Sequence, residues 1–252
     1  MGMQEPGQQL RKRLLDRAKG AIREKASNPE LQAIKAVNLF GDLEVVFNLL
    51  AEQAIEWHSL HFPEMGREVR DNPLYLKFVA LGDKKNFSES EILKLTSDAG
   101  LAKTLSQKAI SSMGAPFSQK DMSQVKSLAV LALNAKQEMS GLSSYIDSSM
   151  KEIAPNFSSV AGSILGARLL AKAGSLRRLA LMPSSTMQIL GAEKALFRHI
   201  KTGAKPPKHG LILQHPSVRK AGRDDKGKAA KRLAAELSLA ARKDFFAEKK
   251  IA

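Results

Sequence analysis

Apolar side chains recur along most of this chain at helical spacing, and the alternation typical of β-strands is scarce. Apolar rows in residues 8–25 and 30–59 predict two helices, with Asn28 as an N-cap and Pro29 in the first turn of the second. Residues 211–213, Leu-Ile-Leu, are the best candidate for a short strand. The pattern therefore predicts an all-α protein.

Two segments in the middle of the chain have the spacing of a coiled coil. Residues 88–113 and 118–150 place apolar or small side chains three and four residues apart in alternation, and residues 114–116, Gly-Ala-Pro, predict a turn between them. The pattern favours an antiparallel helical hairpin, with an ordinary pair of bundle helices as the alternative. Because two helices bury little surface, we expect the hairpin to pack on a second copy or another domain. The side chains expected to mediate this association are Leu128, Met139, Leu142 and Ile146.

A change of composition at residues 154–156 marks the start of a third region. Further helices are expected over residues 158–173, 176–182 and 226–243. We therefore expect an N-terminal helical region over residues 1–86, a coiled-coil hairpin over 87–152 and a compact helical domain over 153–252.

Positive charge is concentrated in that last region. The chain carries a net charge of +15, and residues 161–252 alone hold 20 Lys or Arg against 6 Asp or Glu, a net +14. Such an asymmetry indicates a polyanionic partner, of which nucleic acid is the commonest, although a solvated basic face is the simpler alternative. No apolar run reaches the roughly 18 residues that a membrane span needs, so no membrane partner is expected.

One basic stretch of the predicted compact domain is GAEKALFRHIKTGAKPPKHG, residues 191–210, with five Lys or Arg and two His. If its first half is helical, Lys194, Arg198 and Lys201 share one face, while Leu196, Phe197 and Ile200 fall away from it and anchor the helix to the core. Gly203 is expected to end the helix. A stiff loop would then present three more side chains to RNA, namely Lys205, Lys208 and His209.

Catalytic and metal-binding patterns are weak. The chain has no cysteine, no glycine-rich phosphate loop and no nucleophile elbow. His58 and His61 lack a recognised zinc spacing, so structural roles are favoured and no metal or cofactor is expected. The remaining histidines, His199, His209 and His215, leave a ribonuclease as a rival hypothesis, because acid–base catalysis requires such groups.

Several blocks in order resemble the Nop domain family, found in box C/D RNA-guided methylation particles and in a spliceosomal relative. The blocks are residues 191–210, WHSLHFPEM (57–65), SMGAPFSQKD (112–121), residues 154–199, KHGLILQHP (208–216) and GKAAKRLAAELSLAARKDFF (227–246). The resemblance covers roughly residues 40–250. It implies a coiled-coil hairpin that self-associates, together with a helical Nop domain. That domain would bind a kink-turn RNA already carrying a small kink-turn-binding protein, and it would have no catalytic residues of its own.

By position, the resemblance assigns RNA contacts to the cations of residues 194–208 and to His209, and more weakly to Arg168 and Gln188. It assigns contacts with the neighbouring protein to Gly191, Ala192, Ala195 and Leu196. Because the residues before the hairpin show no alternating strands, recruitment of fibrillarin, the family's methyltransferase partner, is not expected. The alternative is a spliceosomal-like protein that binds another structured RNA. We expect a cytoplasmic location in an archaeon and a nuclear or nucleolar one in a eukaryote.

Overall fold

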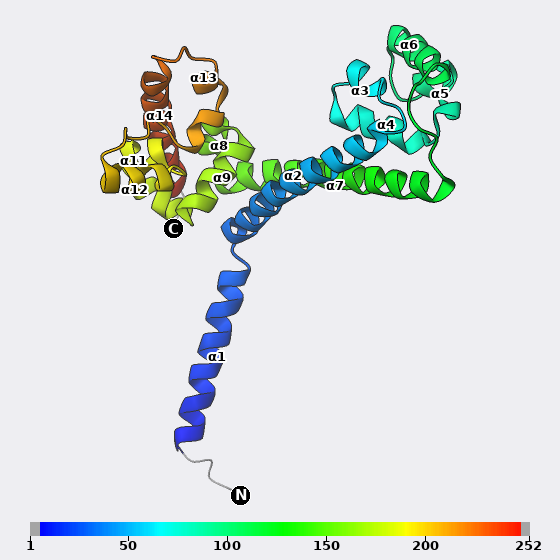
Figure 1. Ribbon diagram of the computed structural model, residues 1–252. Helices are drawn as coiled ribbons and strands as arrows, with labels where there is room; N and C mark the ends of the chain where they lie inside the picture. The colour runs from blue at the N-terminus through cyan, green and yellow to red at the C-terminus, as the bar shows by residue number, and fades with distance from the viewer. Residues whose placement is uncertain (1–5, 248–252) are drawn as a thin grey trace, which may run out of the picture. The chain divides into compact units, whose positions relative to one another are not determined.

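The computed structural model describes residues 6–247, and within that range all regular secondary structure is helical (Figure 1). The predicted all-α class is confirmed. The chain divides into two compact units, Phe40–Leu142 on one hand and Met1–Leu39 with Ser143–Ala252 on the other, in so far as the structure describes them. Two long helices, α2 (Pro29–Ser59) and α7 (Gln119–Ile153), contribute residues to both units. The three-part division expected from the sequence stays a prediction.

The start of α2 follows the expected capping pattern. The Asn28 side-chain oxygen accepts a hydrogen bond from the Glu30 amide at 2.8 Å, and Pro29 is the first helical residue. The preceding helix, α1 (Pro6–Ala26), presents exposed side chains throughout residues 8–23.

The unit of residues 40–142 packs its helices around an aromatic core. Its shorter helices are α3 (Met65–Glu68), α4 (Asn72–Leu81), η1 (Lys84–Asn86), α5 (Glu89–Leu93) and α6 (Ala99–Ile110). Phe62, Phe78 and Phe87 meet in this core, with ring centroids of Phe62 and Phe87 5.3 Å apart in an edge-to-face contact. The Lys136 ammonium of α7 lies 5.3 Å from the centre of the Phe47 ring of α2, so these two helices pack together here.

The predicted hairpin is wrong in its first arm. Residues 88–113 do not form one long helix, because α5 ends at Leu93 and α6 starts only at Ala99. Between them, the Thr96 hydroxyl accepts from the Asp98 amide at 3.3 Å, and the Asp98 carboxylate accepts from the Leu101 amide at 2.9 Å. These side chains stabilise a new helix start within the heptad pattern. The partner of α7 in this unit is α2 instead.

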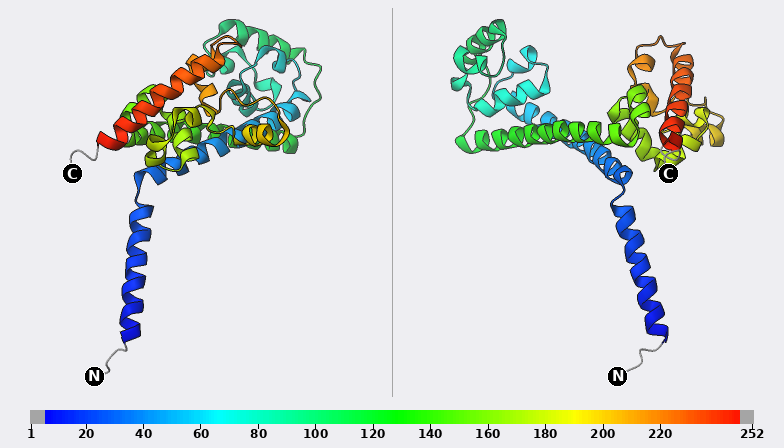
Figure 2. Two further views of the ribbon diagram at one scale, coloured as in Figure 1. Left: turned by 90° about the vertical axis from the view of Figure 1, so that its left-hand side faces the viewer. Right: turned by 180° about the vertical axis from the view of Figure 1, so that it is seen from behind.

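The other unit packs short helices against one long C-terminal helix. They are α8 (Pro155–Ala161), α9 (Ser163–Ala173), α10 (Leu176–Leu181), α11 (Ser184–Ile189), α12 (Glu193–Thr202), η2 (Leu211–Gln214), α13 (Pro216–Arg219) and α14 (Lys226–Ala247). Of these, α8, α10, α11 and α13 contact α14 (Figures 1 and 2). The expected strand at residues 211–213 is wrong, because these residues form the 3₁₀ turn η2.

A buried carboxylate joins the start of α8 to the end of α14. Asp244 of α14 accepts hydrogen bonds from the backbone amides of Asn156 and Phe157, at 3.0 and 2.7 Å, and from the Asn156 side chain at 2.6 Å. Residue 154, which precedes α8, offers no side-chain cap. A carboxylate 88 residues away in sequence therefore satisfies the free amides at the start of α8.

Candidate nucleic-acid interface

The two ends of the stretch of residues 191–210 lie side by side, so the stretch forms an excursion that starts and ends at the same place in the domain. The Leu211 amide donates to the Leu190 carbonyl, and the Gly210 amide to the Gln188 carbonyl, each at 2.8 Å. A Cβ atom on Gly210 would lie 2.0 Å from the Leu190 oxygen, and one on Gly191 would lie 2.5 Å from the Leu211 side chain. Glycine at both ends therefore allows the close approach that closes this excursion.

Helix α12 forms the first half of the excursion, as predicted. It begins at Glu193, whose carboxylate accepts from the Gly191 amide at 2.8 Å. The pKa of Glu193 lies below its ordinary value, mainly because the carboxylate accepts a hydrogen bond from the backbone amide of the same residue. The Gly191 amide and the charge of nearby Lys172 lower this pKa further, while slight burial opposes the shift. The helix ends at Gly203, whose φ of +67° is left-handed, so that prediction is confirmed. The His199 ring nitrogen Nδ1 donates to the Ala204 carbonyl and ties the helix to the following loop.

The predicted cations all point outward. Lys194, Arg198 and Lys201 are exposed on α12, and Lys205 and Lys208 are exposed on the loop. Spacings of four and three residues place the three helical cations on one face. No ion pair among the side chains that the structure describes engages any of the five. Their charge is therefore available to an anionic partner.

The expected core anchors of α12 are wrong for two residues. Phe197 and Ile200 are 61% and 68% exposed, and no residue of α12 is buried. The helix instead packs through its opposite side, on which Ala195, Leu196 and His199 are half-buried. At 100° per residue, Phe197 falls beside the cationic face, and Ile200 falls between Phe197 and the inner side. The exposed surface of α12 is therefore both cationic and apolar.

Four further predicted site residues have defined surroundings. Arg168 donates from its guanidinium to the Gln214 side chain at 2.7 Å, and the Gln188 amide donates to the Lys208 carbonyl at 2.7 Å. Gln188 thus holds the basic loop in place. Ala192 is half-buried just before α12, while His209 is half-buried beside Gly210. Lys172, which the sequence did not single out, lies close enough to Glu193 to affect its carboxylate.

The histidines have structural partners. His215 accepts from the Ser217 amide at 3.3 Å and caps α13, and His199 fixes the end of α12. His58 and His61 are buried in the other unit, where His58 Nδ1 lies 3.2 Å from the Tyr75 hydroxyl. Among residues 6–247, no group of three or more His, Asp or Glu side chains could hold a metal ion. None of the helices described is long and apolar enough to cross a membrane.

Two sequence blocks meet at the buried histidines. His61 Nδ1 donates to the Ala115 carbonyl at 2.9 Å, and His61 Nε2 accepts from the Lys84 amide at 3.2 Å. The Glu64 carboxylate accepts from the Ser112 hydroxyl at 2.8 Å and the Met113 amide at 3.0 Å. Residues 57–65 and 112–116 are therefore joined by side chains whose function is structural.

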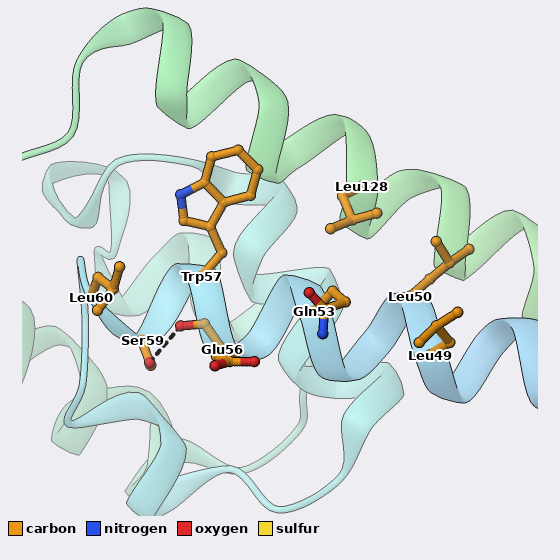
Figure 3. Close-up of a pocket in the computed structure, with 8 residues that line it drawn as sticks. All are labelled: Leu49, Leu50, Gln53, Glu56, Trp57, Ser59, Leu60 and Leu128. Atoms are coloured by element: carbon orange, nitrogen blue, oxygen red, sulfur yellow. Dashed lines mark hydrogen bonds between the residues drawn. The ribbon is translucent and has the colours of Figure 1, made fainter.

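A second exposed feature is an apolar groove of about 820 Å³ on α2 and α7. Figure 3 shows Leu49, Leu50 and Trp57 of α2 around it together with Leu60 just after that helix, and Leu128 of α7 opposite. Trp57 and Leu60 are 40% and 63% exposed. The apolar groove residues of α2 are spaced at helical intervals. This spacing predicted the helix but did not indicate that these side chains would be exposed in a groove.

The residues expected to mediate self-association have mixed environments. Met139 and Ile146 are buried within the chain itself, and Leu128 and Leu142 are half-buried. Of the four, Leu128 lines the groove. Their role in association stays a prediction, but Met139 belongs to the core of residues 40–142.

Known proteins resemble this chain over most of its length. A NOP5 family protein of Methanocaldococcus jannaschii is 38% identical over 90% of the chain, and nucleolar protein 56 of Bos taurus is 37% identical over 85%. Nucleolar protein 58 of Schizosaccharomyces pombe is 39% identical over 86%. The chain spans 55%, 37% and 42% of these relatives, respectively.

A solved structure and a family model add to the comparison. The crystal structure of a fibrillarin/Nop5p complex aligns with 95% of this chain and 70% of its own chain, at 20% identity and a TM-score of 0.44, which is too low to define a common fold. The model of the Nop family, described as "snoRNA binding domain, fibrillarin", matches residues 39–252. From this match and the relatives above, the chain belongs to the Nop family.

Proposed function

We propose that this chain is an RNA-binding scaffold of a ribonucleoprotein. Its ligand would be a kink-turn RNA that already carries a small kink-turn-binding protein, as in box C/D methylation-guide particles. One observation carries the proposal: α12 and its loop present five unpaired cations beside the exposed side chains of Phe197 and Ile200. Cations suit the phosphate backbone, and exposed apolar groups suit a protein surface.

The composite surface explains why neither component alone would be enough. Five contacts to phosphate would give affinity that carries little sequence information and depends strongly on salt. Apolar side chains beside them, together with half-buried Ala195 and Leu196, would contribute only when a protein lies against the RNA. Lys208 is fixed by the hydrogen bond from Gln188, so the loop side of this surface is preorganised.

The scaffold would act by binding and not by catalysis. Of the three histidines that a ribonuclease would use, His199 and His215 hold backbone or side-chain groups of their own domain. Incubation with labelled RNA tests this directly, since cleavage that His209→Ala abolishes would establish the rival activity.

The main test removes two cations from the helical face. Lys194→Ala with Arg198→Ala should abolish assembly on a kink-turn RNA hairpin with its binding protein, as seen in a gel shift, while the helical circular dichroism signal stays unchanged. Lys94→Ala with Lys151→Ala is the matched control, because it removes two exposed, ion-paired cations elsewhere. Unchanged assembly by the first variant would exclude these residues from the site.

Salt dependence tests the same proposal independently. Affinity should fall as salt rises, with a log–log slope of about −0.7 to −0.9 per phosphate neutralised. A flat dependence would contradict an electrostatic interface. Sequencing of RNA bound in cell extract separates a methylation-guide RNA from the alternative, another structured RNA bound by a spliceosomal-like protein.

Fibrillarin recruitment needs its own test. The family description names fibrillarin, which counts against the expectation that this chain does not recruit it. Co-elution with purified fibrillarin would establish recruitment, and separate elution would support the original expectation. Relatives in eukaryotes are named nucleolar proteins, so a nucleolar location is proposed for a eukaryotic source and a cytoplasmic one for an archaeal source.

Self-association is a second proposed property, carried by the groove in Figure 3. Exposed Trp57 lines the same groove as Leu49 and Leu60, and together they form an apolar patch of the kind found at protein interfaces. Trp57→Ala with Leu60→Ser should lower the mass measured by light scattering. The control Leu239→Ser alters an equally exposed leucine on α14 and should leave the mass unchanged. An unchanged mass in the groove variant would reject this surface.

A further inference from the structure

Helix α1 exposes an apolar row that has no partner surface so far. Residues 8–23 are all exposed, and the row consists of Leu10, Leu14, Leu15 and Ile22, each 49% to 67% exposed. At 100° per residue these four side chains fall within one arc of about 140°. Because most helical stability in proteins comes from packing an apolar face, a surface that covers this arc would stabilise α1.

The rest of α1 is strongly basic. Residues 8–23 hold six Lys or Arg and one Asp, a net charge of +5. At 100° per residue, Arg17 and Lys19 flank the apolar arc on its two sides. No ion pair among the side chains that the structure describes engages these cations. Like charges would oppose the pairing of two α1 helices, so the surface that fits α1 is apolar with acidic edges.

The groove on α2 and α7 has this character. Besides its apolar side chains it is lined by Glu56, and the described residues that line it include no lysine or arginine. The exposed Glu52 lies one turn before Glu56 on α2. At 100° per residue both carboxylates fall beside Leu49, at the edge of the apolar row away from Trp57. Figure 3 shows Glu56 and Trp57 on different sides of α2. The groove therefore complements α1 in polarity and in charge.

The lengths of the two surfaces also match. At 1.5 Å per residue, the apolar row of α1 from Leu10 to Ile22 is about 18 Å long, and the groove from Leu49 to Leu60 is about 17 Å long. Only residues 27–28 separate α1 from α2. If two copies place their α2 helices antiparallel, the start of one α2 lies beside the end of the other, where the groove is. The α1 helix of one copy would then join its α2 close to the groove of the other.

We propose that α1 of one copy fills the groove on α2 and α7 of a second copy, and that the exchange is reciprocal. The leucines of α1 would cover Trp57 and Leu60, and one of the flanking cations would face Glu52 and Glu56. This inference rests on the self-association proposed above and names the segment that occupies the groove.

Other ligands of a basic helix match α1 less well. The phosphate backbone of RNA would pair with the cations and leave the apolar arc uncovered. Helices that lie on lipid surfaces commonly carry tryptophan or phenylalanine on the apolar face, and α1 contains neither. A second copy satisfies both the cations and the apolar arc.

Light scattering tests the exchange with two variants and their mixture. Leu10→Gln with Leu14→Gln removes two apolar side chains of α1 and keeps good helix formers, and it should lower the mass to that of a single chain. Trp57→Ala with Leu60→Ser should do the same through the groove. An equimolar mixture of the two variants should regain part of the wild-type mass, because one chain keeps an intact groove and the other an intact α1.

Tryptophan fluorescence identifies the contact in that mixture. Trp57 is the only tryptophan, and the groove variant lacks it, so all tryptophan emission comes from the intact groove of the α1 variant. Adding the groove variant should shift this emission to shorter wavelengths, because α1 covers a ring that is 40% exposed in the single chain. The matched control is Lys12→Gln with Arg23→Gln, which alters the side of α1 opposite the apolar arc and should keep the wild-type mass.

The outcomes separate this inference from the proposals on which it builds. If the α1 variant keeps the wild-type mass while the groove variant loses it, self-association stands and α1 is rejected as the occupant. A mixture that stays at the mass of a single chain also rejects the exchange. If the wild type itself has that mass, self-association fails, and the inference fails with it. Assembly on kink-turn RNA, measured by gel shift, reports the RNA-binding proposal separately.

Two further arms use other ligands. If the leucine variant keeps the wild-type mass but loses binding to kink-turn RNA or to phosphatidylserine vesicles, α1 binds that ligand and the inference is overturned. Circular dichroism of each variant excludes misfolding as the cause. The substituted side chains of α1 are exposed, so these changes leave both cores intact.

Discussion

Residues 57–65 and residues 191–210 carry similar chemistry and use it in opposite ways. Each stretch has two histidines, at least one phenylalanine and charged side chains. In the first, His58, His61 and Phe62 are buried and hydrogen-bonded or packed inside one unit. In the second, the cations and Phe197 are exposed. The residue types alone therefore do not separate a structural motif from a binding surface.

The comparison shows what distinguishes the two. Around residues 57–65, polar groups find partners from the same unit: His61 and Glu64 both bond residues 112–115. Around residues 191–210, internal hydrogen bonds involve the backbone, Glu193, Gln188 and His199, while the five cations remain unpaired within the described residues. Unpaired charge at the surface, and not the presence of histidine, indicates the candidate site.

The largest difference should appear on truncating the phenylalanines. Phe62→Ala removes a fully buried ring from the core of residues 40–142 and should cost about 3–5 kcal/mol of stability. Phe197→Ala removes an exposed ring and should change stability by about 0.5 kcal/mol or less. Urea unfolding measures both. Equal losses would show that Phe197 is packed after all and would end the contrast between the two stretches.

An intermediate effect should appear with pH. Burial, with a smaller contribution from His61, lowers the pKa of His58 from 6.5 to about 3. Between these values the unfolded chain binds a proton that the folded chain does not, so acid favours unfolding. The stabilisation is complete above about pH 6.5 and is lost as the pH falls towards 3, by up to about 1.4 kcal/mol per pH unit.

The fluorescence of Trp57, the only tryptophan, reports this unfolding in urea at pH 7 and pH 5. His58→Gln should show a smaller loss between the two pH values than the wild type. His209→Gln, in the exposed stretch, should behave like the wild type. A loss at His58→Gln as large as that of the wild type would remove His58 as the cause.

The smallest effect should come from the end of α12. Gly203→Ala places a side chain at a φ of +67°, which costs about 1–2 kcal/mol locally and should fray the last turn of the helix. RNA assembly should weaken several-fold, because Lys201 lies in that turn, while the thermal midpoint of the 40–142 unit stays constant. Thr202→Ala is the control on the same turn. Full RNA affinity in Gly203→Ala would show that the geometry of this helix end does not matter for binding.

The sequence was most informative where local rules apply. The cap at Asn28 and the helix end at Gly203 depend on neighbouring residues, and the structure confirms both. The heptad pattern over residues 88–113 led to the wrong prediction of one long helix. Thr96 and Asp98 accept hydrogen bonds that start a new helix, and apolar spacing does not detect such a start. The strand predicted at residues 211–213 was wrong for a related reason. Leu-Ile-Leu has the composition of a strand, but the described residues contain no strand that could pair with it.

The sequence by itself determined that the chain is helical, where its positive charge lies and which residues could share a helix face, since these follow from composition and periodicity. Only the tertiary structure decided which face points outward. It buried His58 and His61, exposed Phe197 and Ile200, and brought Lys208 next to the start of α14. Exposure depends on contacts between residues far apart in the chain, such as Asp244 with Asn156 and Leu211 with Leu190, and helical spacing contains no information about those contacts.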